Sequence, residues 1–252
     1  MKSLFVQLFI FSILSIGSSI TSLAQNSPLQ GDAVLLSFGY GHGVTYGDMS
    51  DRYQDAGIPA FEIEYFMHKS NFSLILSGSA LFSQIVNENI LEPLIINNFI
   101  VGNDRANAII SLDMRGLTLS GGVGYTIPFK SKNSLNGIKI STSLGWMQHR
   151  IRIQDDTRTV IQLSEPYNKG YDRLTGGFMV RNQIAYKYMA SNRRINFEIG
   201  VRNMMGLTKN LRGFNYDTAS STEGSRFDGL ISFYGTFSIP IYFNSSSEEI
   251  YY

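Results

Sequence analysis

The sequence predicts an all-β fold, an eight-stranded antiparallel up-and-down transmembrane β-barrel, and three observations lead to this prediction. First, residues 229–243 alternate between apolar and mostly polar side chains, which is the period of a strand with one apolar face. Second, this run is far longer than the roughly five or six residues of an ordinary strand, as a membrane crossing requires. Third, seven further runs of this kind precede it, and the connections between them alternate between long and short.

The composition excludes several classes of protein. The 252 residues suit one all-β domain, and 13% aromatic residues with 24 glycines are typical of long strands, tight turns and interfacial aromatic belts. Only 16% of the residues are charged and the net charge is +1, so the chain lacks the basic surface of a nucleic-acid binder. The absence of cysteine excludes disulfides, thiolate metal sites and cysteine nucleophiles. We therefore expect no nucleic-acid partner, no metal and no cofactor.

Residues 1–24 have the pattern of a secretory signal peptide. Lys2 supplies a positive start, residues 4–16 form an apolar segment, and Ser-Leu-Ala at 22–24 looks like a cleavage site. The alternative is a membrane-anchoring helix, but the apolar segment is shorter than the roughly 20 residues that such a helix needs. No later apolar stretch approaches that length, so only a barrel would cross a bilayer. The expected domains are the signal peptide 1–24, the barrel 25–243 and a periplasmic tail 244–252.

The expected strands follow from the alternation and end where turn-forming residues gather. They are residues 33–41, 58–67, 72–85, 117–128, 138–153, 175–188, 195–207 and 229–243. The connections after the second, fourth and sixth strands are short, and those after the first, third, fifth and seventh are long. In outer-membrane barrels the short turns face the periplasm and the long loops face outward. We therefore expect a bacterial outer-membrane protein with both mature termini in the periplasm.

Each strand presents one apolar face. In the first four strands an apolar residue recurs at every second position, and Glu62 and Glu64 stand on the polar face of the second strand. The fifth strand keeps this alternation until Gln148, beyond which Ile151 and Ile153 fall on the opposite face. We interpret this change as a bulge or as emergence from the bilayer. The sixth strand carries Asn182 in its apolar face, the seventh is regular, and the eighth closes the ring.

The polar faces would line the barrel interior, and they carry charge. A tight turn at 190–193 would pair Arg181 with Arg202 and Ala185 with Glu198, all facing inward. In an eight-stranded ring the second strand lies opposite the sixth, and the narrow interior would let side chains reach across it. The expected charge network in the lumen consists of Glu62, Glu64, Arg181, Lys187, Glu198 and Arg202. We hypothesise that the two glutamates of the second strand pair with the two arginines and plug the lumen. The alternative is a path for protons, ions or a ligand, which would make the protein a small channel.

The sequence offers no convincing catalytic group. His68-Lys69-Ser70 resembles the His-x-Ser spacing of lipid A deacylase barrels, but it falls in an expected periplasmic turn, the wrong end for outer-leaflet lipid. His149 lies near the extracellular end of the fifth strand with no serine obviously paired to it. We interpret the histidines, including His42, as solvated loop residues and expect no enzyme. An outer-leaflet lipid-modifying enzyme remains the alternative.

The long connection 86–115 is unusually apolar for a solvent-exposed loop. Its candidate partner-docking residues are Ile95, Ile96, Phe99 and Ile100, and Asn97-Asn98 would turn a hairpin among them. Docking of another protein and packing over the barrel mouth are equally open alternatives. The loop would also be long enough to hide two further strands.

Two C-terminal segments carry a resemblance. They are Gly-Tyr-Asp-Arg-Leu-Thr at 170–175 with the hairpin through 192–197, and Arg-Phe-Asp-Gly-Leu at 226–230 with Ile-Pro-Ile-Tyr at 239–242 and Glu-Glu-Ile-Tyr-Tyr at 248–252. Together they resemble a mostly uncharacterised group of Bacteroidota outer-membrane β-barrel proteins. The resemblance implies an outer-membrane location and a role accessory to type IX secretion or gliding motility, and it supplies no catalytic residue. The expected function is structural or interactive, through the extracellular loops, with outer-membrane lipid and other envelope proteins as partners.

Overall fold

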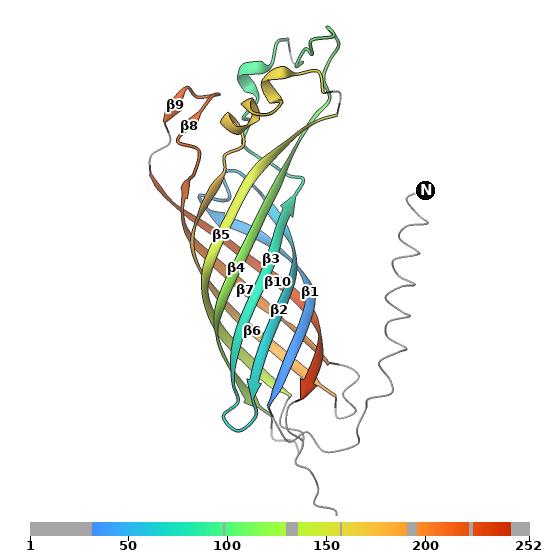
Figure 1. Cartoon of the computed structure of the whole chain (residues 1–252), viewed down its shortest axis with the longest axis vertical. Coiled ribbons are helices and arrows are strands. Elements are labelled where there is room, and N and C mark those ends of the chain that lie inside the picture. Colours follow the sequence, from blue (N-terminus) through green and yellow to red (C-terminus); the bar gives the residue numbers. More distant parts are fainter. Residues whose placement is uncertain are drawn as a thin grey trace, which may run out of the picture.

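The computed structural model describes residues 32–97, 99–129, 136–156, 158–190, 196–221 and 224–242. Within them eight long strands close into a barrel in the ring order β1-β10-β7-β6-β5-β4-β3-β2 (Figure 1). The strands are β1 Ala33–Gly47, β2 Asp55–Met67, β3 Phe72–Ser83, β4 Ile110–Pro128, β5 Gly137–Asp155, β6 Thr175–Met189, β7 Asn196–Asn210 and β10 Ser225–Tyr242. Every pairing is antiparallel, and each strand pairs with its neighbour in the chain before β1 meets β10. The predicted fold class is confirmed.

The remaining elements are short and lie at one end of the barrel, which we call the loop end. They are the two-residue strands β8 Phe214–Asn215 and β9 Ser220–Ser221, and the 3-10 helices η2 Glu92–Leu94, η3 Ile161–Leu163 and η4 Tyr167–Gly170. β4 and β5, with 19 residues each, reach farther beyond the barrel at this end than the other strands (Figure 1). None of the helices in the described ranges is long and apolar enough to cross a membrane.

Several strands extend farther toward the loop end than the sequence predicts. β1 continues to Gly47, where it still pairs with Asp228, and β4 begins at Ile110 opposite Asp155. The loops predicted at 42–57 and 86–115 are therefore too long. The alternation of apolar and polar residues stops before the strands end. Backbone hydrogen bonding between strands continues beyond the apolar belt, where the outward side chains no longer need to be apolar. The connection between β3 and β4 adds no strand to the ring.

The predicted bulge in the fifth strand is wrong. β4 and β5 keep one uninterrupted register from Ile110↔Asp155 to Pro128↔Gly137. Ile151 therefore faces inward like His149, and it is fully buried. The apolar residues change sides because the interior itself becomes apolar toward the loop end.

The predicted register between the sixth and seventh strands is wrong by two residues. Arg181 pairs with Met204, Gln183 with Arg202, and Lys187 with Glu198. The last pair is Met189↔Asn196, so the connection is longer than the predicted turn, most of which lies outside the described residues. A shift of two residues keeps every side chain on its predicted face, because successive side chains alternate between faces.

The barrel exposes apolar side chains and buries polar ones. All eight strands carry large hydrophobic residues on the outside, among them Phe38, Phe61, Leu76, Leu119, Leu144, Ile184, Ile199 and Phe233. We call the end opposite the loop end, where the connections are short, the turn end. Inside lie three layers: a small apolar cluster at the turn end (Ala33, Leu35, Phe66 and Met189), a layer of charged side chains that we call the charged layer, and a larger apolar cluster toward the loop end. An outer surface rich in large apolar side chains, around an interior that buries charged groups, is unlike that of a soluble domain.

Candidate functional site

Lys139 lies at the centre of the charged layer. From β5 its Nζ donates hydrogen bonds to Glu62 Oε1 and Glu64 Oε2, both at 3.0 Å, and to Glu198 Oε2 at 3.1 Å. Lys139 was not among the predicted network residues, although its position on the polar face of its strand was the signal that could have included it. Its side chain joins β5 to β2 and to β7 across the lumen.

Further donors complete each carboxylate. Arg181 Nη2 donates to Glu62 Oε2 at 3.0 Å, and Lys187 Nζ donates to Glu64 Oε1 at 2.9 Å. The hydroxyl of Tyr234 donates to Glu198 Oε1 at 2.5 Å. β2 and β6 stand opposite each other in the ring, so the contact of Arg181 with Glu62 crosses the barrel as hypothesised.

Arg202 differs from the hypothesis. Among the described residues it forms no ion pair with a carboxylate, and its guanidinium lies over the Tyr234 ring, 4.3 Å from the centroid. Its Nε and Nη1 have no hydrogen-bond partner in the described part of the chain. The carboxylates of Glu62 and Glu64 on β2 form ion pairs with Lys139 and Lys187, in place of the predicted pair with Arg202.

The charged layer is a filled, fixed network. Three carboxylates (Glu62, Glu64 and Glu198) meet four cations (Lys139, Arg181, Lys187 and Arg202), all buried. Unpaired charge in a narrow lumen costs several kcal/mol per ion, so the contacts of Lys139, Arg181 and Lys187 with these carboxylates offset much of the cost of burying them. These contacts join opposite walls of the barrel.

An apolar plug fills the barrel toward the loop end. Strands β4 to β7 each contribute one fully buried methionine to this plug: Met114, Met147, Met179 and Met204. Loop residues complete the plug from above: Met49, Tyr53, Ile90, Leu91, Val160, Leu163 and Tyr171. Methionine fills irregular gaps well, which suits a space closed by several loops.

His149 lies buried beneath these loops, so the interpretation of it as a solvated loop residue is wrong. Its Nε2 is 2.9 Å from Asp228 Oδ2, and the hydroxyl of Thr208 donates to the same oxygen. The edge of the Tyr53 ring packs against it at 5.5 Å between centroids. His42 is exposed, as expected. The buried pair ties β5 to β10. No group of three or more metal-ligating side chains occurs in the described residues.

A set of ion pairs fastens the loops to one another. Arg173 donates to Glu88 Oε1 at 2.7 Å and to both oxygens of Asp217, at 2.8 and 2.5 Å. Arg52 Nε lies 3.0 Å from Glu88 Oε2. Burial lowers the pKa of Arg173, but its hydrogen bonds to Asp217 and Glu88 raise that pKa by more, so it stays charged. We call Arg52, Glu88, Arg173 and Asp217 the loop latch.

In the loop between β3 and β4, some of the predicted docking residues are exposed and others pack over the barrel mouth. Ile96 and Phe99 exchange backbone hydrogen bonds of 2.8 and 3.0 Å, and both side chains are exposed, as is Ile95. Ile100 instead packs against the apolar plug, together with Leu94. Of the four predicted docking residues, three are therefore available to a partner and one closes the mouth.

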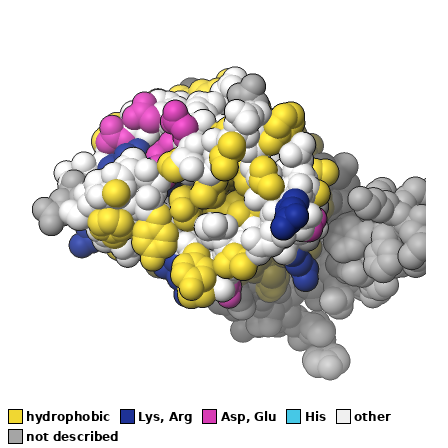
Figure 2. All heavy atoms as spheres, turned by 90° about the horizontal axis from the view of Figure 1, so that it is seen from above, with side chains coloured by type: hydrophobic (Ala, Val, Ile, Leu, Met, Phe, Trp, Pro, Cys, Tyr) yellow, Lys and Arg dark blue, Asp and Glu magenta, His cyan; other side chains and the backbone are white. Residues whose placement is uncertain are grey.

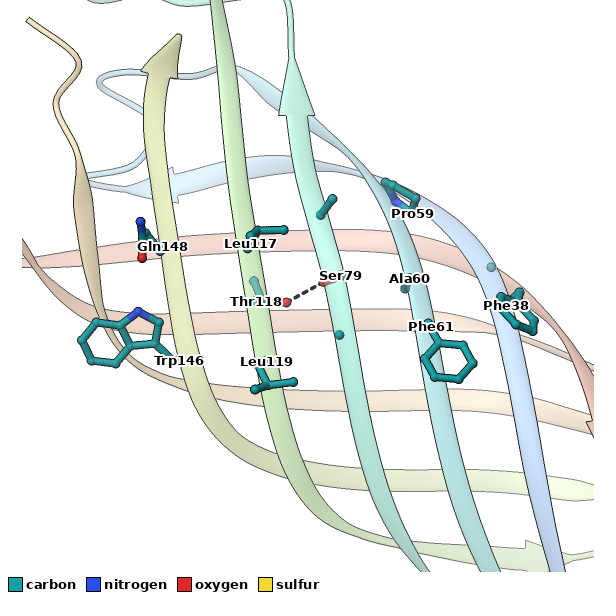
Figure 3. A pocket seen from close by; sticks show the side chains of 13 residues that line it. Phe38, Pro59, Ala60, Phe61, Ser79, Leu117, Thr118, Leu119, Trp146 and Gln148 are labelled. Carbon is teal, nitrogen blue, oxygen red and sulfur yellow. Dashed lines mark hydrogen bonds between the residues drawn. The ribbon is translucent and has the colours of Figure 1, made fainter. Parts of the chain in front are cut away.

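The outer wall carries an apolar groove of about 790 Å³ (Figure 3). β3 presents only Gly78 and Ala80 there, between taller side chains on β2 and β4. Phe61 and Leu119 stand on either side of it, and Trp146 on β5 lies beyond (Figure 3). Behind the groove, Ser79 and Thr118 share a hydrogen bond of 2.5 Å on the inner face.

No protein-family model and no curated protein sequence matches this chain. Among solved structures it is similar to Ail, the attachment invasion locus protein of Yersinia pestis, with 10% identity over 83% of this chain and 99% of that chain (TM-score 0.44). It is also similar to the outer-membrane protein OprG from Pseudomonas aeruginosa, with 12% identity over 84% and 98% (TM-score 0.43), and to Neisserial surface protein A, with 8% identity over 82% and 99% (TM-score 0.37). At such identities the binding properties of these proteins do not transfer. The chain itself is a closed, antiparallel eight-stranded barrel.

Proposed function

We propose that the protein is a non-enzymatic, non-conducting β-barrel of the bacterial outer membrane that acts through its loop end as a structural or interaction component of the envelope. The observation that carries this proposal is the apolar belt on the outside of all eight strands around a charged interior. Burying one Leu or Phe side chain contributes about 1.5–3 kcal/mol relative to leaving it in water, so a belt of this size requires lipid around it.

The direction of insertion follows from the loops. The connections at the turn end are short, and those at the loop end carry β8, β9 and the 3-10 helices. Barrels of the outer membrane place short turns in the periplasm and long loops outside. We therefore orient both mature termini toward the periplasm, and the loop end toward the exterior.

Membrane integration is tested on the full chain expressed in a Gram-negative host. The protein should remain in the outer-membrane fraction after washing with alkaline carbonate, and should migrate faster on a gel when it has not been boiled. Recovery of the mature chain as a dissolved periplasmic protein without detergent would overturn the proposal.

The interaction role rests on the exposed hairpin of Ile95, Ile96 and Phe99. These side chains stand out from a loop whose neighbours, Leu94 and Ile100, are held in the apolar plug. A rigidly presented apolar patch is typical of a protein–protein contact. The resemblance to Bacteroidota barrels names the class of partner: a component of a secretion or gliding assembly.

The partner is tested by placing a photo-crosslinking residue at Ile96 or Phe99 in intact cells and identifying the products by mass spectrometry. Asp51, an exposed residue of another loop, is the matched control position. We expect one discrete envelope protein at the two hairpin positions and none at the control. Equal, diffuse labelling at all three positions would contradict the interaction role.

A further inference from the structure

The apolar groove on the outer wall continues into a basic hollow at its loop end. The second hollow, of about 580 Å³, shares Ala80, Leu117 and Gln148 with the groove and adds Arg115 and Arg150 to the lining. One surface depression therefore runs from the apolar belt to a pair of guanidinium groups.

The register of β4 and β5 explains why the depression changes from apolar to basic along its length. Leu119 pairs with Trp146, Leu117 with Gln148, and Arg115 with Arg150. These pairs share the outward face, and successive pairs are about 7 Å apart along a strand. The wall thus changes from an apolar pair to a doubly cationic pair within two steps at the edge of the belt.

The two arginines face each other without a full complement of carboxylates. Arg115 donates to Asp113 Oδ2 at 3.0 Å and to the carbonyl oxygen of Met114 at 2.8 Å. Arg150 Nη1 is 3.9 Å from Asp172 Oδ2, but Arg212 already holds both oxygens of that carboxylate, at 3.0 and 2.6 Å.

This face therefore has an excess of positive charge. Arg152, the next outward residue of β5, is also exposed and is paired with Asp113 in the strand register, so this one carboxylate stands against three arginines. Like charges directly opposite each other on neighbouring strands repel, and an anion between them would relieve the repulsion. Guanidinium groups bind phosphate oxygens bidentately, so a phosphate suits the pair.

We propose that this depression is a binding site for a phosphate-bearing lipid of the leaflet at the loop end. The phosphate lies between Arg115 and Arg150, and an acyl chain lies along Gly78 and Ala80, walled by Phe61 and Leu119. The site rests on the membrane location proposed above, because only a lipid of the surrounding leaflet reaches both halves at once.

The head-group half is tested by native mass spectrometry of the full chain in detergent. Diacyl phosphatidylglycerol and phosphatidylcholine with identical acyl chains are the probes. We expect the wild type to retain at least about tenfold more of the anionic lipid, and the double variant Arg115→Gln/Arg150→Gln to retain both lipids equally. The control Arg105→Gln/Arg158→Gln removes the same charge from two exposed loop positions and should behave as the wild type.

The acyl half is tested by filling the groove. A Cβ at Gly78 would meet no atom closer than 3.8 Å, so Gly78→Leu should fold and should reduce retention of the anionic lipid at least about fivefold. Gly121→Leu is the matched control, because Gly121 also faces outward with the same 3.8 Å clearance but lies outside the groove.

Three outcomes would overturn the lipid site: equal retention of the two lipids by the wild type, wild-type retention by the double arginine variant, or equal effects of the two glycine variants. Migration of the unboiled protein on a gel is measured alongside. A barrel that stays heat-modifiable but loses no lipid rejects this site alone, whereas a wild type that needs no detergent rejects the proposed function. Arg150→Gln alone serves if the double variant does not fold.

Discussion

Lys139 donates to three carboxylates that come from two other strands, and its side chain is almost completely buried. Glu62 and Glu64 also have their own cations, Arg181 and Lys187, whereas within the described residues Glu198 has only the Tyr234 hydroxyl besides Lys139. At the scale of single residues, the stability of the interior therefore depends most on this one ammonium group.

Replacing Lys139 with Met should destabilise the barrel by about 3–5 kcal/mol, because it leaves buried carboxylates without their shared cation. The temperature at which the unboiled protein loses its fast gel migration should fall clearly. Lys209→Met removes an exposed lysine of β7 and should leave that temperature unchanged. An equal shift in both variants would show that the network contributes little.

Replacing Arg202 should have the opposite effect on the stability of the barrel. Arg202 is buried, lies over Tyr234, and has no carboxylate partner in the described residues, so Arg202→Met removes a desolvated charge that little compensates. Removing a buried charge that lacks an ion-pair partner recovers its desolvation cost, so the substitution should be neutral or stabilising. The same gel assay should show an unchanged or raised melting temperature, with Arg181→Met as a destabilised comparison. A fall as large as that of Arg181→Met would argue against this account.

At the scale of elements, the long loops are held to the barrel in two ways. Their apolar residues enter the plug, and the loop latch ties the segment after β3 to the one before β6 and to the β8–β9 hairpin. Arg173 serves all of these segments, with a backbone φ of 50° that places it in the left-handed region. The apolar plug and the loop latch therefore both restrain the loops.

Arg173→Ala should loosen the loops without opening the barrel. It removes the shared cation of Glu88 and Asp217, so cleavage by proteinase K within residues 84–109 and 211–224 should accelerate several-fold in folded protein. Arg158→Ala, at another left-handed loop arginine, is the control. Unchanged cleavage, or loss of the fast-migrating barrel, would contradict the separation of latch from barrel.

At the scale of the whole molecule, two layers of buried side chains lie across the lumen: the charged layer and the apolar plug. Figure 2 shows the described side chains filling the loop end, with hydrophobic groups gathered on it. An eight-stranded barrel has an interior just wide enough for side chains to fill. A continuous water path is therefore not expected from either end.

The purified full chain should produce no stable unitary currents in a planar bilayer in 1 M salt. The expected reason is the filled lumen, and insertion is verified by protease access to the loops of the same preparation. Regular current steps that are stable with voltage, and that are absent from bilayers without the protein, would favour a small channel as the function.

The alternation of apolar and polar residues by itself determined the number of strands, the face of nearly every residue, and which connections are short and which long. Each of these properties depends on residues close together in the sequence. Glu62, Glu64 and Arg181 could be placed inside the barrel on this basis. Which cation meets which carboxylate was decided by the tertiary structure alone. Lys139 and Glu62 are 77 residues apart, and Arg181 and Glu62 are 119 apart. A two-residue change of register keeps every face but exchanges every partner, and the folding of loops into the mouth turns the upper interior apolar. Contacts of this kind depend on distances across a closed ring, which a local pattern does not contain.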